Sequence, residues 1–528
     1  MDLYPVAFWS ILFSCLTGLA LMLPRLRIGG KGWAALYFVL LLIDVAGGIK
    51  HSAALVYGSA LAWLGLVLLP ALLVRGYHLH LLAQDFASAG RLARIIGCLH
   101  PADGWWEQPK LSRALELAQR DDLPAALESL SRLRANPSMV GFIANAWWFQ
   151  LSQQWKELLA WYTGLPTFAQ HHPHLIQTSL RALGETGDRR GMIDFYHHHR
   201  RRITRFAPQT ERDKTRLLLF AFCGHTRSVE DCFRGGLSRW PAAMREFWLA
   251  TSEFFAGDPA AALQRLRALP SLPDARLRHE VERRVAQLAS PPPTADPAVE
   301  AELSILKTEQ AHDAKFATQP TLFSKAARAT QLLIGLNLAM FTAEILVGGT
   351  TDPATLYGLG ALAPMAVRAG DWSRLATSIF LHWGALHLVM NMLGLWVLAP
   401  FVERALQSRR FLFLYLVAGM GSMGMLVVLA PPESSELAAG ASGSVMGLVG
   451  ATGAILLRGW RREKAFVARR RLLAILAIVA TQTLFDALIP QVSMTAHLSG
   501  AAIGFIVAWL IHPPATPAAT PAADAIQE

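Results

Sequence analysis

The chain has 528 residues and a formal net charge of +11; 53% of its residues are hydrophobic and only 16% are charged. A soluble protein usually carries about 25% charged residues, so this composition excludes an ordinary soluble protein. The shortfall in charge is concentrated in residues 5–74 and 330–512, and the stretch between them is ordinary. We therefore predict an all-α chain with a membrane part on either side of a soluble part.

Three apolar runs open the chain, at residues 5–24, 33–49 and 53–74. Each approaches the length of about 20 residues that a helix needs to cross a bilayer. Asp2 precedes the first run and no basic segment does, so we interpret this run as a retained helix and not as a signal peptide. We assign residues 1–75 to three transmembrane helices.

Residues 76–290 are predicted to form an α-solenoid. Short turn signals recur between amphipathic runs, at Asp121-Asp122, Gln153-Gln154, Gly187-Asp188, Gly224-His225 and Gly257-Asp258. Their intervals of 32, 34, 37 and 33 residues match the period of tetratricopeptide repeats. The segment FFAGDPAAALQRLRAL at 254–269 resembles the turn of such a repeat with its flanking helices. A generic helical bundle is the alternative.

Other features of the soluble part indicate structure and not chemistry. The run at 197–199 is three histidines followed by three arginines, and consecutive helical positions point in different directions, so we expect a solvated basic face and no nucleic-acid partner. The four cysteines, Cys15, Cys98, Cys223 and Cys232, lack metal-site spacing, so we expect no metal and no cofactor, and free thiols in the soluble part. We assign residues 291–325 to a linker with a charged helix at 298–316, and residues 513–528 to a disordered Pro/Ala-rich tail.

Six further apolar runs follow within residues 326–512, at 330–349, 379–401, 411–430, 440–457, 472–489 and 496–512. Basic residues mark the loops on the cytoplasmic side. They are Arg25, Arg27 and Lys31 after the first run of the chain, Arg75 after the third, Lys325 and Arg328 before the fourth, and the clusters at 402–410 and 458–471. The loop at 431–437 is acidic. The alternation predicts a cytoplasmic solenoid, and the Ala/Arg-rich usage with short loops indicates a bacterial inner membrane.

Polar residues inside apolar spans are costly and tend to be functional. Ser442 begins one late helix, where free N–H groups and the positive end of the helix dipole point. Gly443 starts a glycine face on that helix, and His497, Gly500 and Gly504 share a face on the last helix. Small residues let two helices approach closely. We therefore expect this pair of helices to bring His497, as a base, to the nucleophile Ser442.

A third helix carries His387 and Asn391, which lie four residues apart and so share a face. Together with the backbone N–H of Ser442, they are expected to donate hydrogen bonds to an oxyanion. His382 lies at the start of the same helix. A lone serine or histidine in a membrane helix is usually a packing residue. Catalysis is indicated only by the whole set of these residues, in this order on three helices.

In that order, residues 326–512 resemble the rhomboid family of intramembrane serine proteases. The matching text is LHWGALHLVMN at 381–391, RRFLFLYLVAG at 409–419, GASGSVMGLVG at 440–450, which includes Gly440, and AHLSGAAIG at 496–504. The resemblance implies a six-helix core with a water-filled cavity, a dyad of Ser442 and His497 without an acidic third member, and an oxyanion hole lined by His387 and Asn391. It also implies that the substrates are single-span membrane proteins, cut within the lipid bilayer or just above it.

The chain departs from the family pattern at several positions. Arg374 matches the family's Trp-Arg pair, but Ser373 stands where tryptophan is common, with Trp372 one position earlier. Met446 replaces the aromatic residue expected four residues after the nucleophile, and Gln407 replaces the glycine expected four residues after Glu403. Asp486 lies on the helix before His497, and we interpret it as a structural polar contact and not as a triad member.

Two other classes of function remain open at the level of sequence. One is a catalytically silent rhomboid-like scaffold that binds membrane proteins through the core and a cytoplasmic partner through the repeats. Silent members typically lack the serine or the histidine, and this chain has both. The other is a transporter, which requires charged or broken helices at the membrane midplane; the sequence offers only weak candidates for these.

Overall fold

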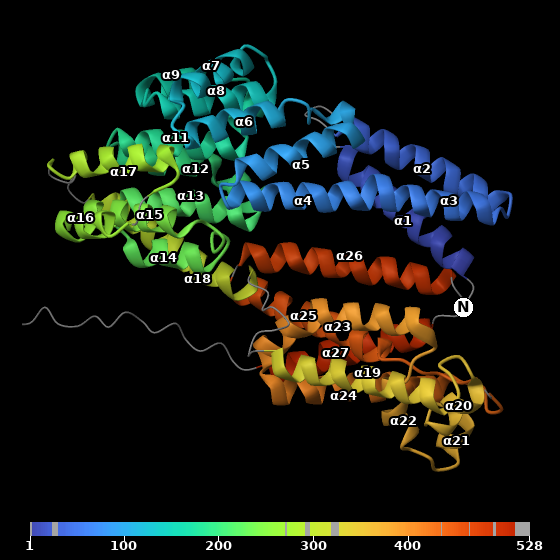
Figure 1. Ribbon diagram of the computed structural model, residues 1–528. Coiled ribbons are helices and arrows are strands. Elements are labelled where there is room, and N and C mark those ends of the chain that lie inside the picture. The colour runs from blue at the N-terminus through green and yellow to red at the C-terminus, as the bar shows by residue number, and fades with distance from the viewer. Residues whose placement is uncertain are drawn as a thin grey trace, which may run out of the picture. The chain divides into compact units, whose positions relative to one another are not determined.

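The computed structural model describes residues 3–23, 30–269, 272–290, 296–317, 327–434, 436–463, 465–488 and 493–512. These residues form helices, turns and loops, with one isolated antiparallel bridge between Leu362 and Ala438. The chain divides into two compact units, Met1–Ala311 and His312–Glu528 (Figure 1). Several predictions lie outside the described residues: those on Asp2, Arg25, Arg27 and Lys325, on the proline-rich segment 291–295 and on the tail 513–528.

The first unit opens with helices of membrane-spanning length. They are α1 (Leu3–Met22), α2 (Lys31–Ile49) and a continuous helix formed by α3 (Ala53–Trp63), the π-helical turn η2 (Leu64–Leu68) and α4 (Leu69–Leu82). The third run was expected to end at residue 74, but its helix continues for a further two turns to Leu82. The reason is that Arg75 ends the apolar pattern without ending the helix, since arginine is a good helix former.

The middle of the unit is a series of paired helices. They are α5 (Phe86–Leu99), α6 (Gln108–Gln119), α7 (Leu123–Arg134), α8 (Met139–Leu151), α9 (Trp155–Thr163), α10 (Thr167–Gln170), α11 (Pro173–Glu185), α12 (Arg189–Phe206), α13 (Gln209–Phe222), α14 (Thr226–Arg234), α15 (Ala242–Phe255), α16 (Pro259–Arg267) and α17 (Ala275–Gln287). The short 3₁₀ turn η3 (Pro101–Asp103) joins α5 to α6. The helical character is as predicted, and the tetratricopeptide type stays a prediction.

Each predicted turn signal falls between two helices. In three of them, a left-handed residue is followed by an aspartate that caps the next helix. The first residue of each signal has a left-handed backbone, with φ of 71° at Asp121, 81° at Gly187 and 92° at Gly257. In these three signals the second residue is an aspartate that caps the next helix: the side chain of Asp258, for example, accepts the backbone N–H of Ala261 at 2.8 Å. Such a cap satisfies a backbone donor that the helix leaves free. The dipeptide period therefore marks real helix boundaries.

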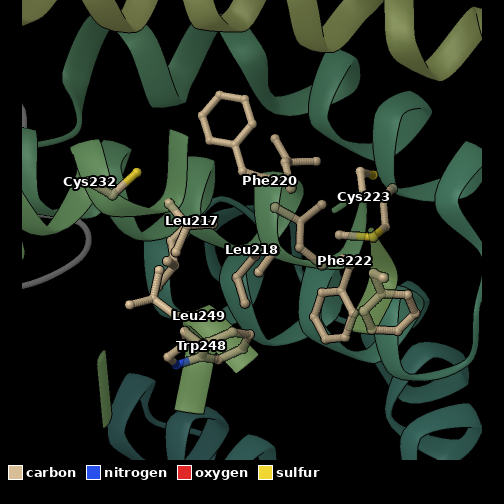
Figure 2. Packing of buried hydrophobic residues seen from close by; sticks show 14 of the residues in the cluster. Leu217, Leu218, Phe220, Phe222, Cys223, Cys232, Trp248 and Leu249 are labelled. Carbon is tan, nitrogen blue, oxygen red and sulfur yellow. The ribbon is translucent and has the colours of Figure 1, made fainter. Parts of the chain in front are cut away.

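The core of this part of the chain is built on α13 and α15. Leu217, Leu218 and Phe222 of α13 are buried against Trp248 of α15 (Figure 2). Cys223 lies in the same cluster, and burial raises the pKa of its thiol to about 12. All four cysteines are free thiols.

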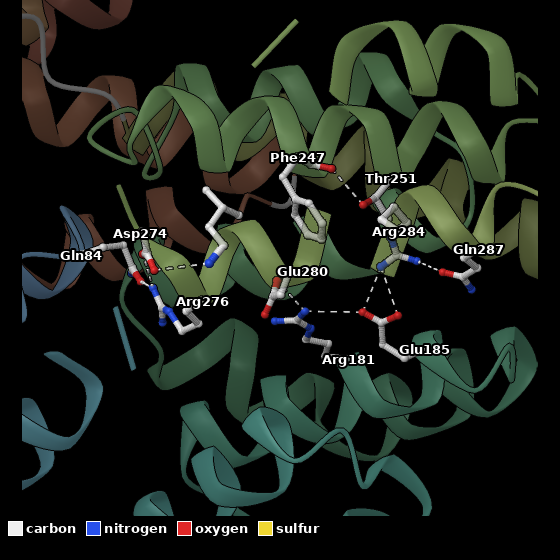
Figure 3. Close-up of polar contacts among 11 residues, drawn as sticks. Gln84, Arg181, Glu185, Phe247, Thr251, Asp274, Arg276, Glu280, Arg284 and Gln287 are labelled. Atoms are coloured by element: carbon white, nitrogen blue, oxygen red, sulfur yellow. Dashed lines mark hydrogen bonds and ion pairs between the residues drawn. The ribbon is translucent and has the colours of Figure 1, made fainter. Parts of the chain in front are cut away.

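Helix α17 is bound to α11 by two largely buried ion pairs (Figure 3). Arg181 of α11 pairs with Glu280 of α17 at 2.9 Å, and Arg284 of α17 pairs with Glu185 of α11 at 2.9 Å. Burial alone would raise the pKa of Glu280, but the nearby Arg181 outweighs it and holds this pKa below its ordinary value. Removing one partner of such a pair would leave an uncompensated charge, so these contacts make the position of α17 depend on α11.

The described part of the predicted linker is largely helical. Helix α18 (Pro297–Ala317) matches the charged helix expected at 298–316. Its residues Val299, Leu303 and Leu306 are buried in the same cluster as α13 and α15. The linker therefore contributes apolar side chains to the first unit.

From Arg328 to Ile511, the described residues of the second unit form six long helices and three short ones. They are α19 (Arg328–Val347), α20 (Pro353–Gly358), α21 (Pro364–Arg368), α22 (Arg374–Thr377), α23 (Gly384–Leu406), α24 (Ser408–Leu429), α25 (Ser442–Glu463), α26 (Phe466–Leu488) and α27 (Met494–Ile511). A 3₁₀ turn, η5 (Ser378–Phe380), precedes α23. Eight described helices of the chain are long and apolar enough to cross a membrane, and five of them lie in this unit.

Helix α25 is not among the eight, although the sequence predicts a span at 440–457. Its glycines and its terminal Arg458, Arg461 and Arg462 lower its hydropathy. The helix is nevertheless buried along most of its length, in contact with α23, α24, α26 and α27. Neighbouring helices, and not lipid, therefore surround it. The prediction of an all-α polytopic membrane protein is confirmed.

Candidate active site

Helices α25 and α27 meet backbone to backbone along their glycine faces. A Cβ atom at Gly500 would lie 2.3 Å from the carbonyl oxygen of Gly443, and one at Gly504 would lie 2.0 Å from that of Gly447. Real Cβ atoms do not approach another atom so closely. Any residue larger than glycine would therefore force the two helices apart, and the close packing expected from the sequence is present.

Ser442 is the first residue of α25, so its side chain stands where free backbone N–H groups gather. The loop before it is held from two sides. The backbone N–H of Gly440, with φ of 143°, donates to the carbonyl of Ser378 at 2.9 Å, and Ala438 pairs with Leu362 in the isolated bridge. The position of Ser442 is thus fixed by its loop as well as by its helix.

His497 lies in the first turn of α27 and is only 8% exposed. The helix is capped by Ser493, whose hydroxyl accepts the N–H of Ala496 at 3.2 Å. A Cβ atom at Gly443 would lie 3.7 Å from the carbonyl oxygen of Ala496. The residues that adjoin Ser442 and His497 are therefore neighbours, which brings the first turns of the two helices together. Among the described residues, Ser442 and His497 do not form a hydrogen bond with each other.

His387 lies against the loop that leads to Ser442. A Cβ atom at Gly440 would lie 2.5 Å from Cε1 of His387, so only glycine leaves room for this ring. Asn391 is one turn further along α23 and is buried, and its amide donates to the carbonyl of His387 at 3.0 Å. The structure therefore brings His387 close to the nucleophile's loop, whereas the amide of Asn391 is bonded to its own helix.

The start of α23 was predicted wrongly. The expected helix begins at 379, but α23 begins at Gly384, whose φ is 80°, after the turn η5. His382 therefore lies in the connecting segment, with its ring edge-to-face with that of His387 at 5.4 Å between centroids. The left-handed Gly384 breaks the helical path that the apolar pattern alone would continue.

A buried acid that was not predicted from the sequence lies beside His382. Glu344 of α19 is fully buried, and its Oε1 accepts the backbone N–H of His382 at 2.9 Å. Its Oε2 and both ring nitrogens of His382 are buried without a hydrogen bond among the described residues. A glutamate inside the apolar run 330–349 was the available signal.

Arg374 does not reach the site. Its guanidinium binds Asp371 at 2.7 Å and the carbonyls of Tyr357 and Ala361 at 2.8 Å each, which ties together the segment between α19 and α23. Trp372 is 66% exposed and stays outside this arrangement. Arg374 therefore shapes the loop and does not contact the reacting groups.

The structure shows the surroundings of two further departures from the family pattern, Met446 and Gln407. Met446, one turn after Ser442, is 7% exposed and belongs to the core cluster of the unit. Glu403 accepts the backbone N–H groups of Ala329 and Thr330 at 2.9 Å each and so caps α19. Gln407 has φ of 67°, a conformation that favours glycine, which explains why glycine is expected there.

Asp486 contacts the candidate base directly. Its Oδ2 lies 2.7 Å from Nδ1 of His497, and its side chain is 1% exposed. Its Oδ1 accepts the side-chain amide of Gln482 at 2.7 Å. Asp486 was predicted from the sequence to be a structural polar contact and not a triad member, and Gln482 was not predicted to be part of the site.

Helices of this length and apolarity define a multi-pass integral membrane protein. A family model described as Rhomboid domain matches residues 369–514. Rhomboid protease GluP of Bacillus subtilis is 35% identical over 179 residues, which cover 34% of this chain and 34% of GluP. A second Bacillus subtilis protein with a rhomboid protease name, YdcA, is 33% identical over 159 residues, 30% of this chain and 74% of YdcA.

Rhomboid protease AarA of Providencia stuartii is 29% identical over 206 residues, which cover 35% of this chain and 73% of AarA. The chain belongs to the rhomboid family. The alignment with GluP spans only about a third of the length of GluP. The residues of this chain that match the Rhomboid domain model all lie in its second unit.

Proposed function

We propose that this protein is an intramembrane serine endopeptidase in which Ser442 is the nucleophile and His497 is the general base. The observation that carries the proposal is the contact between the backbones of Gly443 and Gly500, because it aligns the first turns of α25 and α27. His497 bonds to Asp486 through Nδ1, which leaves Nε2 available to Ser442. Catalytic hydrogen bonds are often long in the absence of substrate and tighten when it binds.

The proposed reaction begins with proton transfer from Oγ of Ser442 to Nε2 of His497 as the oxygen attacks the peptide carbonyl. The backbone N–H of Ser442 and the side chains of His387 and Asn391 donate to the oxyanion, which requires the amide of Asn391 to turn from its helix. His497 then gives its proton to the leaving amine. A water molecule, deprotonated by His497, hydrolyses the acyl-enzyme and restores Ser442.

The substrates we propose are single-span membrane proteins, whose transmembrane segment partly unwinds in a cavity between the helices. Basic residues in the loops at 402–410 and 458–471 favour a cytoplasmic location for those loops. On this basis the repeat helices lie in the cytoplasm and the active site opens to the opposite side of a bacterial inner membrane.

The repeat helices are proposed to recruit a cytoplasmic protein partner. A cavity of about 150 Å³ among α8, α11, α13, α15 and α17 supports this role. Three tryptophans line it together with charged groups: Trp147, Trp240, Trp248, Arg181 and Lys214. Aromatic and arginine side chains are enriched at the centres of protein interfaces.

The alternative is a catalytically silent scaffold. The presence of both Ser442 and His497, in helices whose first turns adjoin, favours the enzyme. The test is cleavage of a single-span membrane substrate by the full chain in detergent, compared with its Ser442→Ala and His497→Ala variants. We expect cleavage by the wild type alone. Equal cleavage by the wild type and Ser442→Ala would contradict the proposal.

A further inference from the structure

Asp486 is a buried carboxyl group that bonds to His497, but a dyad of Ser442 and His497 gives it no role in the reaction itself. It lies near the end of α26, whose buried side chains are otherwise Val467, Ala468, Leu472 and Ile475, all apolar. A charged side chain inside a membrane is costly unless it is paired. Its hydrogen-bond partners are His497 and Gln482, both at 2.7 Å.

The two contacts define the role of each oxygen. The amide N–H of Gln482 donates to Oδ1, so this oxygen is an acceptor. A carboxylate accepts at both oxygens and an ionised one forms short, strong hydrogen bonds. The 2.7 Å contact of Oδ2 is then best satisfied by a proton on Nδ1 of His497. With that tautomer, the lone pair on the imidazole is at Nε2.

Resting on the proposed function, we infer that Asp486 is a positioning residue that makes the site a Ser442–His497–Asp486 relay, with Gln482 orienting the carboxylate. Asp486 holds His497 in the tautomer that can accept the proton of Ser442. When that proton arrives at Nε2, the proton on Nδ1 stays in place and the carboxylate stabilises the imidazolium. Asp486 itself is not protonated at any step. The family resemblance, by contrast, implies a dyad without an acid.

A purely structural role is the competing explanation, in which the contact only joins α26 to α27. The two explanations differ in which substitution at position 486 should preserve catalysis. Asparagine keeps the size of Asp486 but presents an amide that can donate to Nδ1 and so favour the wrong tautomer. Glutamate changes the length but keeps the acceptor. If Asp486 only joined the two helices, the glutamate variant would not have a higher kcat than the asparagine variant.

The test uses the full chain in detergent and two readouts, the rate at which a fluorophosphonate probe labels Ser442 and the kcat and KM for a single-span membrane substrate. We expect Asp486→Asn to lower kcat and the labelling rate by about 10² to 10⁴-fold, the upper value being that of a serine protease triad aspartate changed to asparagine. KM and the melting temperature should stay close to those of the wild type. Asp486→Glu should recover part of the lost kcat.

A matched control is Asp44→Asn. Asp44 is also a fully buried carboxyl in a membrane helix, and it accepts a hydrogen bond from Ser59 at 2.9 Å. This variant should leave kcat unchanged. The inference is overturned if Asp486→Asn keeps kcat within about threefold of the wild type, or if kcat falls only in step with the melting temperature and glutamate recovers none of it. The proposed function has a separate failure, which is activity in Ser442→Ala.

Discussion

One of the tightest backbone contacts between α25 and α27 gives the sharpest prediction, for the change Gly504→Ala. The new Cβ atom would lie 2.0 Å from the carbonyl oxygen of Gly447, and real Cβ contacts below 3.0 Å do not occur. The obstacle is backbone on a buried helix and not the end of a flexible side chain. Helix α27 must therefore move away from α25 by about 1 Å.

The expected magnitudes follow from that displacement. Overpacking of a well-packed interior typically lowers the free energy of unfolding by about 1–3 kcal/mol. A misplacement of about 1 Å between catalytic groups can lower the rate by about 100-fold. Because His497 is carried by α27, we expect Gly504→Ala to slow substrate cleavage and fluorophosphonate labelling of Ser442 by about that factor.

Gly453→Ala is the matched control on α25. A Cβ atom there would meet only Cγ2 of Ile475 and Cδ2 of Phe505, both at 3.8 Å, which is ordinary contact. Alanine is the better helix former, so this variant should be neutral or more stable by up to about 1 kcal/mol. The two variants are compared by melting temperature in detergent and by labelling rate. Equal behaviour of Gly504→Ala and Gly453→Ala would refute the claim that the glycine faces align the site.

Three further predictions concern stability. Burial, with smaller contributions from His172 and Lys214, lowers the pKa of His174 from 6.5 to about 3 in the folded chain. Between pH 3 and pH 6.5 the unfolded chain therefore binds more protons than the folded chain. The free energy of unfolding should fall by about 1.4 kcal/mol per pH unit as the pH drops below 6.5. Hydrogen exchange in α11, measured at pH 7 and pH 5, should show this loss of stability in the wild type and not in His174→Gln. Gln407→Gly should raise the melting temperature, since Gln407 has φ 67° and ψ 154°, a backbone region that is essentially restricted to glycine and costs other residues about 1–3 kcal/mol; a lower melting temperature would contradict this. Asp258→Ala should cost about 1 kcal/mol through loss of the α16 cap, measured as faster hydrogen exchange in α16, and unchanged exchange would disprove the capping role.

Local pattern predicted those parts of the structure that depend on one helix or one turn. The dipeptides such as Gly257-Asp258 mark helix boundaries because a left-handed residue and a capping side chain are both local requirements. The glycine faces around Gly443 and Gly500 were readable because a stripe of small residues has one good use in a membrane helix, which is close approach to another helix.

The parts that escaped prediction depend on how separate helices are rotated against each other. Asp486 lies 11 residues from His497 in the chain, and nothing in the pattern of α26 says which helix its carboxyl faces. The same holds for Glu344, which meets His382 only because the chain between them folds back. Hydropathy also gives no sign that α25 is enclosed by its neighbours, because enclosure is a property of the packed unit.

The central claim, that His497 activates Ser442 as a nucleophile, is tested most directly by locating the covalent adduct of a fluorophosphonate probe. The full chain is labelled in detergent, digested, and the modified residue is identified by mass spectrometry. We predict one adduct on Ser442, absent in Ser442→Ala and slowed by orders of magnitude in His497→Ala, while labelling of Ser444 on the same helix stays at background. An adduct elsewhere, or undiminished labelling of Ser442 in His497→Ala, would contradict the account.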